Sequence, residues 1–174
     1  AFPGMHNPEP VAHNLKILSQ TVLAEQANVG LAMDGDADRV GVVDEAGKFI
    51  TTLQVYALLA YYLLEIRGLR GPLIKSVTVG TMPQRLGEIY GVPVYETAVG
   101  FKHIAPLMAE GEALLGGEES GGYAFRGHLP ERDGVLSGLM ILDLIAQTGK
   151  QISELVAELN RVVGPHFFDR LDIP

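Results

Sequence analysis

The sequence predicts an α/β fold in which one complete domain follows part of another, with the boundary near residue 50. Strand-like apolar runs alternate with segments of helical period along the chain, which is typical of layered α/β proteins. A new helical segment begins just after residue 50 and opens a second α/β unit. With 174 residues, 47% of them hydrophobic, the chain can form one domain core and part of another. We therefore expect domains over residues 1–50 and 51–165, and a linker toward an absent domain over 166–174.

Residues before this boundary are expected to form one helix and three strands. Leu15, Leu18 and Val22 recur at helical spacing and predict an amphipathic helix over residues 14–27. The predicted strands cover residues 29–33, 40–44 and 48–51, the last two joined as a hairpin by a turn at 45–47. The acidic segment that separates the first two strands is the most informative stretch of the sequence.

The second unit begins with a helix from residue 53, which ends before Gly68 and Gly71-Pro72 because these residues break helices. Further strands are predicted at residues 73–79, 92–96 and 113–115, with 123–125 as a candidate extension of the sheet. Helices are predicted at residues 82–90, in a short segment through 108, and at 134–147 and 152–163.

The acidic segment between the first two strands predicts a metal site. Asp34, Asp36 and Asp38 alternate with small residues and are followed at once by Arg39. Carboxylates held close together raise one another's pKa, and a divalent cation removes that cost while accepting oxygen ligands. The small residues allow a tight turn in which the three side chains converge.

Two other interpretations of this segment fit the sequence less well. An EF-hand loop counted from Asp34 would place Glu45 correctly at position 12, but Arg39 stands at position 6, where that loop requires glycine. The flanking runs are also strand-like, whereas an EF-hand is flanked by helices. A simple polar turn would not require three acids in strict alternation closed by an arginine.

Composition and charge exclude several functional classes. The net charge of −8 makes the average surface unfavourable for nucleic acid, so an anionic substrate would need a local group of cations. The sequence has no cysteine, which excludes disulfides, thiolate metal sites and cysteine nucleophiles. The longest apolar stretch, residues 53–64, is too short to span a bilayer. We expect a cytoplasmic protein without nucleic-acid or membrane partners.

A glycine-rich segment over residues 116–122 follows a predicted strand. It lacks the Gly-any-Gly triplet of a dinucleotide site, and Glu118 occupies the position where a nucleophile elbow requires glycine. On an extended backbone the side chains of Glu118 and Ser120 point the same way, and a carboxylate beside a hydroxyl can bind vicinal sugar hydroxyls. The alternative is a glycine-rich connection whose acids are solvated.

Two further polar segments carry weaker signals. Lys102 follows a glycine at the predicted start of a helix, where a cation can neutralise a phosphate or exchange a proton, although single lysines are usually solvated. Asp133 precedes a predicted helix and is interpreted as its N-cap, with Arg132 as a surface charge.

Four segments, taken together in this order and spacing, are similar to the α-D-phosphohexomutase family, the phosphoglucomutase and phosphomannomutase group. They are Asp34-Gly35-Asp36-Ala37-Asp38-Arg39, residues 96–102, Gly117-Glu118-Glu119-Ser120-Gly121-Gly122, and residues 128–134. The resemblance implies α/β domains with mixed sheets and places this chain at the end of the second domain and across the third. It also implies that the phosphorylated serine of the first domain and the phosphate-binding loop of the fourth are absent from this chain.

The resemblance implies a role for each matching residue. The three aspartates would hold Mg²⁺ against the phosphoserine of the intact enzyme. Arg39 would contact the substrate and neutralise the transferring phosphoryl group, and Lys102 would contact the substrate and act as a candidate acid or base. Glu118 and Ser120 would bind sugar hydroxyls. Positioning and charge neutralisation are what phosphoryl transfer chiefly requires.

The implied reaction interconverts hexose 1-phosphate and hexose 6-phosphate through a phosphoserine enzyme and a hexose bisphosphate. Glu119 and Gly122 look more like the phosphoglucomutase branch than the phosphomannomutase or phosphoglucosamine branches, so we expect glucose as the hexose. The isolated chain is expected to be inactive without its missing domains. A non-catalytic module that binds a metal or a sugar phosphate is the alternative from another functional class.

Overall fold

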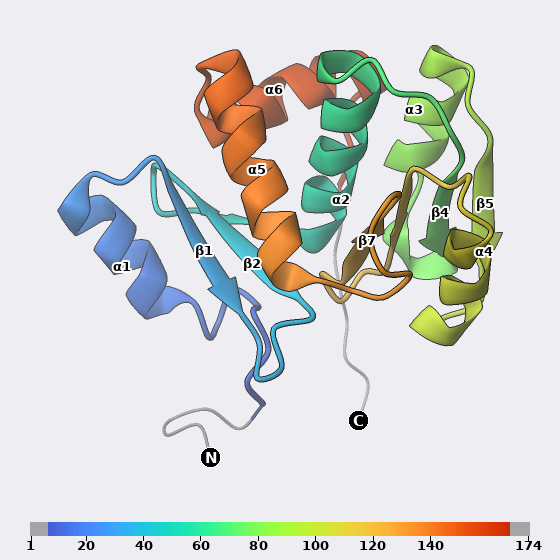
Figure 1. The fold of residues 1–174 in the computed structure, drawn as a ribbon. Helices are drawn as coiled ribbons and strands as arrows, with labels where there is room; N and C mark the ends of the chain where they lie inside the picture. Colours follow the sequence, from blue (N-terminus) through green and yellow to red (C-terminus); the bar gives the residue numbers. More distant parts are fainter. Residues whose placement is uncertain (1–6, 168–174) are drawn as a thin grey trace.

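The computed structural model describes residues 7–167, and most of the expected linker over 166–174 therefore lies outside the described residues. The first sheet is antiparallel, in the order β1-β2-β3, and consists of β1 (Val29–Met33), β2 (Val40–Asp44) and β3 (Phe49–Ile50). Helix α1 (Lys16–Glu25) covers one face of this sheet, and α5 (Gly134–Thr148) lies against the other (Figure 1). The first sheet is thus packed on both faces.

The second sheet is mixed, which confirms the expected fold class. Its order is β5-β4-β6-β7, from β4 (Leu73–Ser76), β5 (Val94–Thr97), β6 (Leu115–Gly117) and β7 (Tyr123–Phe125). Strand β4 is parallel to both β5 and β6, whereas β7 returns antiparallel to β6. Because parallel strands require crossover connections, helices separate β4, β5 and β6 along the chain.

Helices cover both faces of the second sheet. On β4, Leu73 faces the main core beneath α2 (Thr52–Tyr61) and α3 (Met82–Tyr90), while Ile74 faces the opposite side. On that opposite side lie Phe101 from the 3₁₀ turn Phe101–His103, Met108 from the short helix α4 (Ala105–Ala109), and Ile104 between these two elements. The alternation of side chains along a strand therefore produces three layers.

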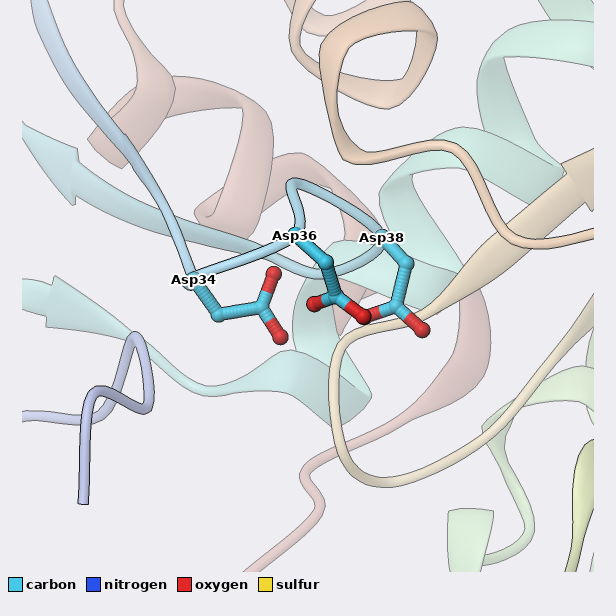
Figure 2. Close-up of side chains that lie close together, drawn as sticks. All are labelled: Asp34, Asp36 and Asp38. Atoms are coloured by element: carbon cyan, nitrogen blue, oxygen red, sulfur yellow. The ribbon is translucent and has the colours of Figure 1, made fainter.

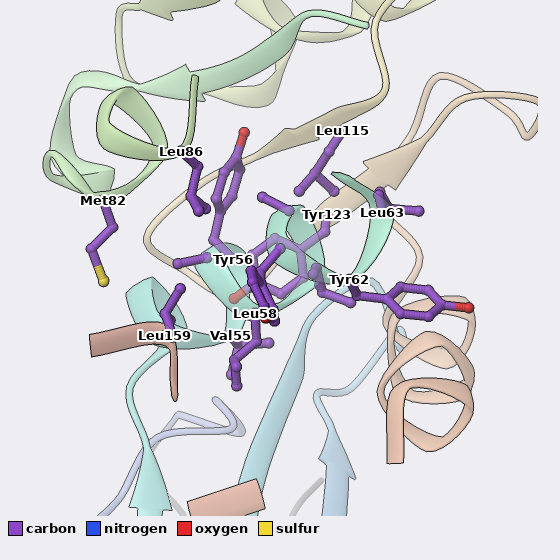
Figure 3. Close-up of a cluster of buried hydrophobic side chains, with 14 of the residues drawn as sticks. Val55, Tyr56, Leu58, Tyr62, Leu63, Met82, Leu86, Leu115, Tyr123 and Leu159 are labelled. Carbon is purple, nitrogen blue, oxygen red and sulfur yellow. The ribbon is translucent and has the colours of Figure 1, made fainter. Parts of the chain in front are cut away.

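Helix α2 is the centre of the main core (Figure 3). Nearly every residue of α2 is buried, as expected for a helix that is apolar all round. Its start is fixed by a capping box between Thr51 and Gln54, and it continues into a π-helical turn over Tyr62–Ile66. Helix α6 (Ile152–Val163) covers it from the remaining side.

The apolar core does not divide at residue 50. Val40, Val42 and Ile50 belong to the same buried cluster as Leu58 and Leu115. The two sheets therefore share one core. The division into domains over 1–50 and 51–165 stays a prediction about the parent protein. In the described part of the chain, β1 pairs with β2 alone, so its other edge is open.

Four strands differ from their predicted bounds. Strand β3 is shorter than the predicted 48–51, and β5 covers 94–97 in place of 92–96. Strand β4 ends at Ser76, and residues 77–79 form a 3₁₀ turn, whereas the sequence predicted a strand through 79. Strand β6 includes Gly116 and Gly117, which were assigned to a loop. A Cβ on Gly116 would lie 2.7 Å from Ile104 Cγ2, and one on Gly117 would lie 2.7 Å from a Tyr56 ring carbon. These glycines therefore permit close packing within the strand.

Candidate functional site

The acidic loop brings its three carboxylates together, as the sequence predicted. One oxygen from each of Asp34, Asp36 and Asp38 lies within 4.8 Å of the others, and Figure 2 shows the three side chains converging from a single turn. Ala37 has a left-handed backbone, with φ of +59°, which turns the chain between the second and third acids. This donor set is all-oxygen and anionic, and it fits a hard divalent cation.

An EF-hand is inconsistent with this geometry. The acidic loop joins the antiparallel strands β1 and β2, and no helix flanks it directly. Glu45, which would be the twelfth residue of an EF-hand loop, lies beyond the far end of β2 and accepts hydrogen bonds from Ser153. The length of a strand therefore separates it from the three aspartates.

Asp34 is paired with the arginine that follows the loop. Its side chain is 1% exposed, and Arg39 Nε donates to Asp34 Oδ2 at 2.5 Å while the Arg39 backbone N–H donates to Oδ1 at 3.1 Å. Burial alone would raise the pKa of Asp34, but these hydrogen bonds outweigh burial and lower it below its usual value. Arg39 also lies 3.4 Å from Glu9 and 3.6 Å from Asp38.

Asp38 is paired with a cation from a distant part of the chain. Arg132 Nη2 lies 2.5 Å from Asp38 Oδ2, so the interpretation of Arg132 as a surface charge is wrong. Burial raises the pKa of Asp38, and the neighbouring Asp34 and Asp36 add to this, while Arg132 partly offsets it. A cation bound by the three acids would favour the charged form of Asp38 further.

Glu118 and Ser120 lie in the turn between β6 and β7. Glu118 is 5% exposed, and its Oε1 accepts a hydrogen bond of 2.8 Å from the backbone N–H of Gly100. Its Oε2 lies 3.6 Å from Arg132 Nη1, so Arg132 lies between Asp38 and Glu118. Ser120 Oγ is buried and has no hydrogen-bond partner among residues 7–167. An unpaired buried hydroxyl is unusual, and a bound water or ligand would satisfy it.

Backbone hydrogen bonds attach the acidic loop to the second sheet. The Val40 N–H donates to the Gly121 carbonyl at 3.0 Å, and the Gly134 N–H, at the start of α5, donates to the Ala37 carbonyl at 2.9 Å. Gly121 has a φ of +93°, a conformation that favours glycine. The acidic loop and the turn containing Glu118 therefore form one site, although they are about eighty residues apart in sequence.

Comparisons with known proteins identify the family of this chain. The family model described as phosphoglucomutase/phosphomannomutase, alpha/beta/alpha domain III, matches residues 52–162, and the domain II model matches residues 1–47. The chain belongs to the phosphoglucomutase/phosphomannomutase family.

Individual relatives support the same assignment. A phosphoglucomutase/phosphomannomutase of Thermococcus kodakarensis is 37% identical over 158 residues, which cover 91% of this chain and 34% of that protein. A phosphoglucosamine mutase of Listeria monocytogenes is 39% identical over 147 residues, covering 82% of this chain and 32% of that protein. The crystal structure of a putative phosphomannomutase from Thermus thermophilus is 42% identical, with a TM-score of 0.86 over 91% of this chain and 36% of that one.

The chain spans about a third of the length of these curated relatives. Among residues 7–167, none of the helices has the length and hydropathy needed to cross a membrane.

The other residues expected in the site differ in their surroundings. Lys102 lies in the 3₁₀ turn next to Gly100 and is exposed, so the structure places it at the margin of the site. The Glu119 carboxylate accepts hydrogen bonds from Ser76 and Thr78 at the end of β4. Glu119, which we used to distinguish branches of this mutase family, is therefore held at the end of the second sheet.

Arg132 is the site residue that sequence reasoning missed. Asp133 behaves as predicted, since its Oδ1 accepts from the Leu136 N–H at 2.8 Å and caps α5. An N-cap at the edge of the site places the residue before it close to the site as well, and that was an available signal. The Arg132 guanidinium also lies 5.6 Å from the centre of the Phe101 ring, which gives its carbon stem and charge an apolar support.

Proposed function

We propose that this chain is the part of a phosphohexomutase that binds Mg²⁺ and the sugar of a hexose phosphate. The parent protein would interconvert hexose 1-phosphate and hexose 6-phosphate through a phosphoserine and a hexose bisphosphate. The observation that carries the proposal is the junction of three converging carboxylates with Glu118 and Ser120 in one site. Family membership supports the reaction class, and the phosphoserine and remaining domains would come from other parts of the parent chain.

The residues of this chain would bind and position the reactants. Asp34, Asp36 and Asp38 would hold Mg²⁺, which would neutralise charge on the phosphoryl group. Arg39 lies beside the same loop and would add a second positive charge there. The contact with Asp34 uses only some of the guanidinium N–H groups of Arg39, so others could donate to a phosphate oxygen.

Glu118, Ser120 and Lys102 would act on the hexose phosphate. The carboxylate of Glu118 has acceptor capacity beyond the Gly100 N–H, and the unpaired Ser120 hydroxyl can donate or accept. Both would bind sugar hydroxyls. Lys102, exposed at the margin, would meet the phosphate as a point charge or transfer a proton.

Glucose stays our proposed hexose, on the basis of Glu119 and Gly122. The relatives include a phosphoglucomutase/phosphomannomutase and a phosphoglucosamine mutase, so mannose and glucosamine phosphates are the alternatives. Turnover of each hexose 1-phosphate by the full-length parent would decide among them. The cytoplasmic location stays a prediction, which subcellular fractionation would test.

Calorimetric titration of the 174-residue chain with Mg²⁺ tests the metal site. Asp36 is exposed and lies outside the ion pairs made by Asp34 and Asp38, so Asp36→Asn removes a ligand with little effect on the fold. We expect it to weaken Mg²⁺ binding by about tenfold or more, at least the loss typical of changes around a metal site. Glu45→Gln is the matched control and should bind like the wild type, because Glu45 lies beyond the far end of β2.

Activity of the parent protein tests the reaction. Asp36→Asn in the full-length parent should abolish most mutase activity, while the 174-residue chain alone should show none. Wild-type turnover by the variant would remove Asp36 from the metal site. Micromolar Ca²⁺ binding with little response to Mg²⁺ would instead support a non-catalytic binding module.

A further inference from the structure

Arg132 reaches Asp38 and Glu118 by crossing the backbone of Gly122. A Cβ built on Gly122 would lie 2.2 Å from Arg132 Cδ and 2.9 Å from Cγ. Both separations are far below van der Waals contact, and they involve the stem of the arginine, well before its guanidinium. Any side chain at position 122 would therefore occupy the space through which Arg132 passes.

Backbone conformation does not require glycine at position 122. Gly121 has a φ of +93° and Gly127 a φ of +84°, but Gly122 has no left-handed φ, so other residues could adopt its conformation. The structure therefore explains glycine at position 122 by the space that the Arg132 side chain occupies.

The position of Arg132 links the two halves of the site. Its guanidinium contacts Asp38 at 2.5 Å and lies 3.6 Å from Glu118, and its Nε is buried without a hydrogen-bond partner among residues 7–167. A guanidinium that lies against the Phe101 ring and beside the carboxylates of Asp38, Glu118 and, at 3.8 Å, Glu131 has little freedom to move.

We propose that Gly122 and Arg132 are a coupled pair of positioning residues: Gly122 leaves the passage, and Arg132 joins the cation loop to the sugar-binding turn and competes with a bound cation for Asp38. The competition rests on the proposed metal site, whereas the steric coupling does not. Substitution at position 122 would therefore change metal binding without touching a metal ligand.

A double-mutant cycle measured by urea unfolding without metal tests the coupling. Gly122→Ala should reduce the folding equilibrium constant by about tenfold, as expected for overpacking. In the Arg132→Ala background, which lacks the stem beyond Cβ, the same substitution should change it by less than about threefold. In the Arg132→Met background, which keeps a stem but no charge, the penalty should remain.

Every result of the cycle bears on the coupling. Equal penalties of Gly122→Ala with and without the Arg132 stem would overturn it, as would a Gly122→Ala chain as stable as the wild type. If Gly122→Ala alone does not fold, recovery of folding in Gly122→Ala/Arg132→Ala would confirm the coupling, and failure to recover would overturn it.

Mg²⁺ calorimetry tests the competition for Asp38. Removing the positive charge with Arg132→Met should tighten Mg²⁺ binding by about threefold or more, because a cation no longer lies beside Asp38. Arg85→Met removes an equal charge from an exposed pair on α3 and should have little effect. Unchanged or weaker binding in Arg132→Met would overturn the competition. Absence of binding in the wild type would contradict the proposed function and with it the competition, while the unfolding cycle would still judge the coupling.

Discussion

Replacement of Gly134 by alanine should damage the site through the backbone of the acidic loop. Gly134 is the first residue of α5, and a Cβ there would lie 2.5 Å from the Arg39 carbonyl oxygen and 2.8 Å from the Ala37 carbonyl oxygen. Backbone atoms cannot rotate away as a side chain can, so either the loop or the helix must move. The movement would also lengthen the hydrogen bond from the Gly134 N–H to Ala37, which is 2.9 Å in the wild type.

The expected change in unfolding free energy follows from two destabilising contributions and one stabilising contribution. Overpacking costs about 1–3 kcal/mol, and weakening one hydrogen bond costs up to about 1 kcal/mol. The better helix propensity of alanine returns at most about 1 kcal/mol. We expect the unfolding free energy to fall by about 1–3 kcal/mol, and Mg²⁺ binding to weaken because the aspartates shift with the loop.

Gly138→Ala is the matched control in the same helix. A Cβ on Gly138 would meet only Leu31 Cδ1 and Met33 Cε, each at 3.2 Å, and these are ends of flexible side chains. We expect its unfolding free energy to stay within about 1 kcal/mol of the wild type, since helix propensity favours alanine. Urea unfolding and Mg²⁺ calorimetry of both variants provide the test. Equal stability and equal metal affinity of the two variants would refute the proposed role of close backbone contact at Gly134.

Two further predictions concern stability. Because the pKa of Asp34 is lowered in the folded chain, its ionised form stabilises the fold above its unfolded pKa of about 3.9 and loses this effect as the pH falls further. In metal-free acid unfolding, Asp34→Asn should be less stable than the wild type near neutral pH, and the difference should vanish in strong acid; a constant difference would be contrary to this. Tyr56→Phe removes a buried hydrogen bond of 2.9 Å to the Ile74 carbonyl and should cost about 1–2 kcal/mol in urea unfolding. Tyr62→Phe should cost less, because its hydroxyl donates to Asp143, whose side chain is 37% exposed, so water can replace the lost hydroxyl. A larger loss of unfolding free energy in Tyr62→Phe than in Tyr56→Phe would contradict this reasoning.

Most of the fold follows from local patterns in the sequence. Helix α6 and strands β1 and β2 have their predicted bounds, because hydrophobic period and flanking turn residues define them. Strand β6 was misplaced because its glycines were taken as loop residues, and only the packing of Ile104 and Tyr56 against them shows why they lie in a strand. A contact between distant segments leaves no local signal.

The site shows the same distinction between local and distant information. The convergence of Asp34, Asp36 and Asp38 could be predicted, because alternation within one turn determines it. The role of Arg132 was missed, because its partner Asp38 lies about ninety residues earlier in the chain. The N-cap beside it was a signal that it lies near the site, but a charge in that place was interpreted as solvated. Prediction from a single sequence therefore identified the three converging acids and missed the arginine that lies between Asp38 and Glu118.

The hydrogen bond from the Val40 N–H to the Gly121 carbonyl involves main-chain atoms alone. A side-chain substitution does not delete those atoms, so the separation between the aspartate turn and the β6–β7 turn is set by how the two sheets meet. Substitutions that leave Gly121 and Gly134 in place can therefore change the side chains of either turn while the distance across the site is retained, whereas a Cβ on Gly121 would lie 2.9 Å from the Val40 carbonyl oxygen. If the proposed function holds, such an arrangement would let the residues around Glu118 vary without displacing the three aspartates.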